Sequence, residues 1–113
     1  MAVAVCRALK ILCVAEDADG LAALKRAAVS SEWELTPGAT NEADALEQID
    51  AERPHVLVVF GSYANLVALA RQRSPRLRIV ADRDLPGVTL VAASPEEARQ
   101  LVLGHTRPGG PVL

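Results

Sequence analysis

Three carboxylates stand where the chain could hold a divalent cation. Glu16 and Asp17 directly follow the apolar run ALKILCVA, and Asp82 ends the later run LRIVAD. Open α/β sheets bind ligands outside the carboxyl ends of their strands, and carboxylate oxygens are ligands of Mg²⁺. A weak divalent site is therefore one interpretation. The simpler one, which we favour, is that Asp17 caps the next helix while the other two acids are solvated.

Two other segments resemble chemical motifs without completing them. FGSYAN puts Gly61 and Ser62 at a strand-to-helix turn, where free N–H groups can bind an anion, but it has the spacing of neither GxGxxG nor GxxxxGK(S/T). His55 and His105 are the only histidines, and the sequence places no serine or cysteine nucleophile with either. We therefore expect no enzyme: no catalytic residues, no metal site and no cofactor.

The composition excludes several classes of function. The chain has 113 residues, 50% of them hydrophobic, which fits one domain with an aliphatic core. One Trp, one Tyr and one Phe, together with a net charge of −2, give neither a stacking platform nor a basic stripe for nucleic acid. No run approaches the roughly 18 apolar residues of a membrane helix. We expect a cytoplasmic protein in which Cys6 and Cys13 stay reduced.

Apolar runs and cap residues predict alternating strands and helices. Residues 8–15 and 55–61 are nearly continuous apolar runs, typical of strands covered on both faces, whereas residues 33–39 alternate like a strand at a sheet edge. Runs at 77–82 and 88–93 also look like strands. Helices are expected between the strands, the last ending at Gly104, with caps at Asp17 or Asp19, Asn41, Ser62 and Ser94.

Strands that alternate with helices indicate the α/β class. We expect a mainly parallel five-stranded sheet in three layers, formed by residues 1–104 and followed by a flexible tail at 105–113. The joint RDLPG at 83–87 is too short for a helical crossover, so the fourth helix should be shortened or missing. Either the last two strands form an antiparallel hairpin, or one of them is not a strand.

Residues 9–103 resemble the receiver domains of response regulators, on the ordered segments KILCVAED, the helix at Leu21, WELTPGATNEADALEQIDAERPHVLVVFG and SPEEARQLV. The resemblance implies a flavodoxin-like sheet with strand order 2-1-3-4-5. It places the family's pair of Mg²⁺-holding acids on Ala15 and Glu16, with Asp17 next to them. It places the aspartate that accepts phosphate on Phe60, which we expect to be an aromatic plug.

The remaining receiver groups are also replaced. The family's switch hydroxyl falls on Ala81 or Asp82, and its Lys-Pro pair falls on Val91 and Ala92. The chain is thus similar to pseudo-receivers, including the N-terminal domains of pilus-assembly ATPases related to the MinD family. In those proteins the domain is thought to serve localisation or self-association. The resemblance implies a domain that is not phosphorylated and that signals or localises through contact with a protein partner or a second copy.

The absence of the fourth helix predicts where that contact would form. Apolar sheet surface near Ile79, Val80, Val88 and Leu90 should be less covered than a parallel sheet tolerates, so we expect an interface there. Two alternatives remain open at this point. A small molecule could replace phosphate at the carboxyl ends of the strands, or Glu16 and Asp82 could serve a small metal-dependent enzyme.

Overall fold

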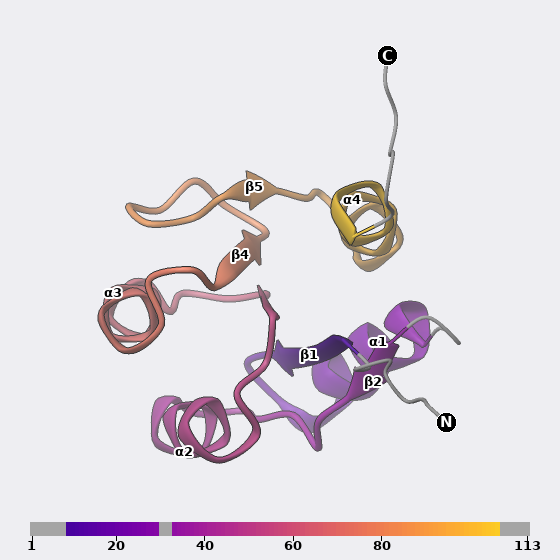
Figure 1. Ribbon diagram of the computed structural model, residues 1–113. Helices are drawn as coiled ribbons and strands as arrows, with labels where there is room; N and C mark the ends of the chain where they lie inside the picture. Colours follow the sequence, from indigo (N-terminus) through magenta and orange to yellow (C-terminus); the bar gives the residue numbers. More distant parts are fainter. Residues whose placement is uncertain (1–8, 30–32, 107–113) are drawn as a thin grey trace, which may run out of the picture.

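A computed structural model describes residues 9–29 and 33–106, which form one parallel sheet with helices on both faces (Figure 1). The strand order is β2-β1-β3-β4-β5, and every pairing is parallel. This is the flavodoxin-like arrangement, and it confirms the predicted fold class. In chain order the elements are β1 (Leu9–Val14), α1 (Ala18–Ala28), β2 (Trp33–Leu35), α2 (Glu42–Glu52), β3 (Val56–Val59), α3 (Ala64–Arg73), β4 (Arg78–Ala81), β5 (Leu90–Val91) and α4 (Pro95–Thr106).

The core lies in two layers, one on each face of the sheet. Alternate residues of a strand point to opposite faces, so Leu12 and Val14 of β1 pack beneath α2 and α3, whereas Ile11 and Cys13 pack beneath α1 and α4. All four residues of β3 are buried, as expected for a central strand. Burial raises the pKa of the Cys13 thiol to about 12, so this cysteine is a packed apolar group rather than a nucleophile.

Three of the predicted helix caps are confirmed. Asp17 accepts from the Gly20 N–H at 2.6 Å, Asn41 from the Asp44 N–H at 2.8 Å, and Ser94 from the Glu97 N–H at 3.1 Å. The fourth predicted cap, Ser62, is wrong. Helix α3 begins after Tyr63, which makes no side-chain cap bond, and the Ser62 hydroxyl accepts from Arg83 instead. Helix α4 also continues past the expected stop at Gly104 to Thr106. Cys6 and residues 107–113 lie outside the described residues.

The connection between β4 and β5 corrects two predictions. The hairpin alternative is wrong, because β5 runs parallel to β4. The strand-like run at 88–93 is also shorter than predicted, with only Leu90 and Val91 in β5. Residues 82–89 contain no helix, as expected. The chain therefore makes a parallel crossover with a loop where a helix would ordinarily run.

This loop covers the sheet that the missing helix would have left open. Leu85 and Val88 pack against the core on the α2 and α3 face, which includes Ile79, 0% exposed. Val80 points to the opposite face, where it packs in the core beneath α1 and α4 and is 2% exposed. The prediction that Ile79 and Val80 would be poorly covered is therefore wrong. Arg71 of α3 holds the loop in place, since its guanidinium donates to the carbonyl of Gly87 at 2.7 Å and to that of Leu77 at 2.6 Å.

The opposite edge of the sheet is held by a tryptophan. Trp33 of β2 is 6% exposed, and its indole N–H donates to the Ala28 carbonyl, at the end of α1, at 2.7 Å. The predicted edge strand is confirmed but is limited to Trp33–Leu35, with Ala39 forming an isolated bridge to Val14. No helix among the described residues is long and apolar enough to cross a membrane.

Candidate functional site

The parallel sheet brings the sequence-predicted site residues to one end of the molecule. Glu16 follows β1, Phe60 follows β3 and Asp82 follows β4, so all three stand at the carboxyl ends of adjacent strands. The backbone joins them: the Phe60 N–H donates to the Val14 carbonyl at 2.9 Å, and the Asp82 N–H donates to the Val59 carbonyl at 3.2 Å. The fold thus places these positions next to one another, while Val91 lies one strand further out in β5.

The acids at this end are engaged by groups of the chain itself. Arg83 donates to both carboxylate oxygens of Asp82, from Nε at 2.9 Å and from Nη2 at 3.1 Å. Its third nitrogen, Nη1, donates to the Ser62 hydroxyl at 2.8 Å. The carboxylate of Glu16 accepts from the Ser62 N–H at 3.0 Å. We call these four residues, Glu16, Ser62, Asp82 and Arg83, the carboxyl-end network.

The network keeps Asp82 ionised. Partial burial acts to raise the pKa of Asp82, but the hydrogen bonds from Arg83 and from the Gly61 N–H, together with the Arg83 charge, leave it below its ordinary value. The pKa of Arg83 is raised, mainly by the hydrogen bond to Asp82 and by the charge of that carboxylate. A fork of two parallel hydrogen bonds is the strongest geometry for this pair. The carboxylate is therefore satisfied without a metal ion.

Glycine is required at the turn that closes the network. Gly61 has φ +142°, a backbone conformation that L side chains rarely adopt, and its N–H donates to Asp82 Oδ1 at 3.3 Å. A Cβ at this position would lie 2.5 Å from Cγ of Glu16. The strand-to-helix turn that suggested an anion site is therefore filled by the chain's own carboxylates.

Tyr63 closes the side of this end that faces α2. Its hydroxyl lies 3.0 Å from the Ala15 carbonyl and 2.9 Å from the Thr40 carbonyl, so it bridges the segments that follow β1 and β2. Burial and the nearby Glu16 charge raise the pKa of Tyr63, so its hydroxyl stays protonated and donating. Sequence analysis missed Tyr63 and Arg83, although each stands within two positions of a residue that it did select.

The remaining predicted positions have structural uses. Phe60 is half-buried and packs against the core on the α1 and α4 face. Ala15 is buried, and its N–H donates to the Ala39 carbonyl at 3.2 Å. Asp17 is the cap of α1. Within the part of the chain that the structure describes, no group of three His, Cys, Asp or Glu side chains is placed to hold a metal ion.

The comparison with known proteins bears on the fold. No protein-family model matches the sequence, and no curated protein matches it. Among solved structures, the chain is similar to the crystal structure of a novel cobalamin-binding protein from Desulfitobacterium hafniense DCB-2, with a TM-score of 0.66 and 12% identity. The match covers 85% of this chain and 58% of that one, so this chain spans less than two thirds of the neighbour's length. At this identity the likeness shows the shared fold alone.

Proposed function

We propose that this domain is a pseudo-receiver that is not phosphorylated and that acts through protein–protein contact, like the N-terminal domains of pilus-assembly ATPases that it resembles. The observation that carries the proposal is the carboxyl-end network. Phosphoryl transfer to an aspartate needs a carboxylate nucleophile, a divalent cation and a cationic partner for the developing charge. Here Phe60 stands at the nucleophile position, and the Asp82 carboxylate is already paired with Arg83.

The edge of the sheet at β5 is the surface that fits such a contact. In the described chain β5 pairs with β4 on one side and with no strand on the other. Val91 is 47% exposed, and the neighbouring Val88 and Leu90 are half-buried. An edge strand with an exposed apolar side chain offers unpaired backbone groups to another chain. Because Ile79 and Val80 are covered, the proposed interface narrows to residues 88–91.

The first test concerns phosphorylation. The full chain is incubated with acetyl phosphate and Mg²⁺, and separately with beryllofluoride and Mg²⁺. We expect no gain of one phosphate in the intact mass and no change in the amide resonances around Phe60, because no aspartate stands after β3 to react. A stable phosphorylated species would overturn the proposal.

The second test concerns self-association, with a second copy of the chain as the partner. Light scattering should show a dimer that Val91→Asp dissociates, because a charge would be placed on the pairing edge. Val29→Asp is the matched control: Val29 is 61% exposed but lies at the end of α1, away from β5. A monomer at hundreds of micromolar, or a dimer that both variants weaken equally, would refute association through this edge.

A further inference from the structure

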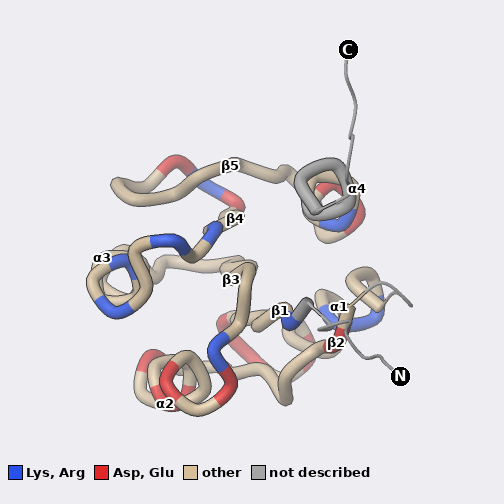
Figure 2. The backbone as a smooth tube through the Cα atoms, in the orientation of Figure 1, with Lys and Arg blue, Asp and Glu red and all other residues tan. Residues whose placement is uncertain are grey.

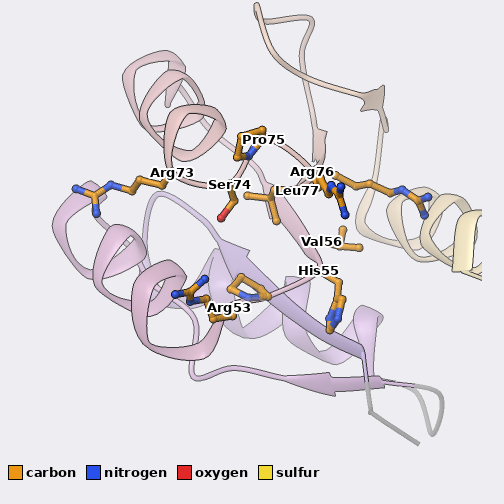
Figure 3. Close-up of a pocket in the computed structure, with 10 residues that line it drawn as sticks. Arg53, His55, Val56, Arg73, Ser74, Pro75, Arg76 and Leu77 are labelled. Atoms are coloured by element: carbon orange, nitrogen blue, oxygen red, sulfur yellow. The ribbon is translucent and has the colours of Figure 1, made fainter.

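A basic pocket opens at the end of the sheet opposite to the carboxyl-end network. It has a volume of about 690 Å³, within the range of small-molecule sites, and lies where α2 leads into β3 and α3 leads into β4 (Figure 3). We call it the amino-end pocket. It is lined by Arg53, Pro54, His55, Val56, Arg73, Ser74, Pro75, Arg76, Leu77 and Arg78.

The charge of this pocket is opposite in sign to that of the chain. Four of the lining residues are arginines, and the lining contains no aspartate or glutamate. The chain as a whole has a net charge of −2. Figure 2 shows basic residues along the two segments that enter β3 and β4, in addition to those on other elements such as α1 and α3. Cations concentrated at one concave site attract anions, and guanidinium groups bind phosphoryl oxygens in pairs.

Part of this charge has a structural use. Arg73 pairs with Asp50 of α2 and points away from the middle of the pocket in Figure 3. Arg53 and Arg73 also stand at the carboxyl ends of α2 and α3, where cations stabilise the helix dipole. That explanation does not extend to Arg76, which stands in the turn after α3. The pocket therefore holds more positive charge than the two helix ends account for.

The wall that carries Arg76 is held rigidly. The Leu77 N–H donates to the Ser74 carbonyl at 3.0 Å, which closes a turn with Arg76 inside it. Arg71 of α3 also holds this turn, donating from Nη1 to the Pro75 carbonyl at 2.8 Å and to the Leu77 carbonyl at 2.6 Å. A wall that is already ordered loses little freedom when a ligand binds.

The facing wall presents Arg53 in an uncommon backbone conformation. Arg53 ends α2 with φ 53° and ψ 57°, the left-handed region in which glycine is usual and arginine is not. It is the one described residue other than glycine with a positive φ. Its neighbour His55 accepts from the Lys10 N–H at Nδ1, 3.1 Å away, which leaves Nε2 to carry a proton for donation. Arginine at this position costs stability but places a guanidinium at the pocket.

We propose that the amino-end pocket binds a small molecule that carries two or more phosphoryl groups. Arg53 and Arg76 stand on different walls, as Figure 3 shows, so one ligand would meet them with separate anionic groups. The buried Pro54, Val56 and Leu77 supply an apolar floor for the uncharged part of the ligand. This site is independent of phosphorylation and of the β5 edge, so its test can fail while the proposed function stands.

The test is an NMR titration of the full chain with pyrophosphate and with ATP, at matched ionic strength. We expect saturable shifts of the amides of Arg53, His55, Ser74 and Arg76. The double variant Arg53→Gly, Arg76→Ala should weaken binding of both probes at least about tenfold, because charge-assisted hydrogen bonds are lost. Glycine keeps the positive φ of residue 53 without strain, so the variant folds.

Arg26→Ala is the matched control, because Arg26 is an exposed arginine in the last turn of α1, with the same helix-end position but no part in the pocket. It should leave binding unchanged. If the control weakened binding of the two probes as much as the double variant does, the effect would come from the overall charge of the chain and not from the pocket. That result would overturn the proposal. Saturable binding of a glutamate-rich peptide without any binding of pyrophosphate or ATP would also overturn it, in favour of a protein partner.

Discussion

At the carboxyl ends of β1, β3 and β4, the acids Glu16 and Asp82 are satisfied by Ser62 and Arg83, whereas at the amino ends of β3 and β4 arginines line an open pocket that has no acid in its lining. The two ends belong to the same strands but differ in how charge is compensated. Function in open α/β sheets is usually sought at the carboxyl ends. In this chain the acids at that end are paired with its own side chains, and the pocket that we propose as a ligand site lies at the other end.

The largest expected effect tests how tightly the carboxyl end is closed. Gly61→Ala should lower the free energy of unfolding by about 3 kcal/mol, because φ +142° is strained for alanine and its Cβ would meet Glu16. Denaturant unfolding followed by circular dichroism measures this. The double variant with Glu16→Ala removes the close approach but not the strain, so it should recover only part of the loss. Full recovery would mean that the backbone conformation costs nothing.

Phe60→Asp should have the next largest effect. It removes apolar packing on the α1 and α4 face and adds a further carboxylate to the end that already holds Glu16 and Asp82, so we expect a loss of about 2 kcal/mol. Phe60→Leu keeps the packing and should lose under about 1 kcal/mol. Unfolding curves and intact mass after acetyl phosphate treatment are the readouts. Phosphate uptake by Phe60→Asp at wild-type stability would show that the carboxyl end is open.

The dependence of stability on pH should show how much the pairing of Asp82 with Arg83 contributes to the fold. The pKa of Asp82 is lowered in the folded chain, so its pairing with Arg83 stabilises the fold above about pH 4 and this contribution is lost as pH falls further. The stability difference between wild type and Arg83→Met should therefore be largest near neutral pH and should close below pH 4. Arg26→Met, with the same change in charge, should show no such closure. A constant difference across this range would contradict the assignment.

The smallest effect has the opposite sign and lies at the amino end. Arg53→Gly should raise the unfolding free energy by about 0.5 to 1 kcal/mol, because glycine adopts φ 53° without strain, while it weakens binding of pyrophosphate. Arg53→Ala should weaken binding equally without the gain in stability. Calorimetric melting and the phosphate titration together measure both quantities. A gain in stability with binding unchanged would leave the pocket without a role for Arg53.

The order of strands and helices could be predicted because it depends on local patterns. The apolar runs marked β1 and β3, and Asp17, Asn41 and Ser94 marked three helix starts. The β4–β5 crossover was harder, because the short RDLPG joint suggested a hairpin. A loop can replace the helix there because a distant arginine, Arg71, holds it. That contact joins α3 to Gly87, 16 residues further along the chain, so no local sequence pattern could predict it.

The two ends of the sheet were not equally readable in the sequence. Glu16 and Asp82 attracted attention because acids after strands suggest metal binding, but their partner Arg83 was read only as part of a loop. The amino-end pocket was missed altogether. The sequence did contain evidence for this pocket, because basic residues precede both β3 and β4. Neighbouring parallel strands have their amino ends at the same end of the sheet, so these residues lie close together. Reading the residues before strands as carefully as those after them would have found it.

The position of Trp33 gives the molecule a built-in fluorescent reporter. It is the one tryptophan of the chain, it is buried, and its indole N–H is held by the Ala28 carbonyl. Two strands, β1 and β3, separate β2 from β4, so the indole stands apart from the β5 edge. Its emission should shift to longer wavelength when the whole fold opens to water, and it should stay unchanged when two copies pair along β5. One optical signal can therefore separate unfolding from association.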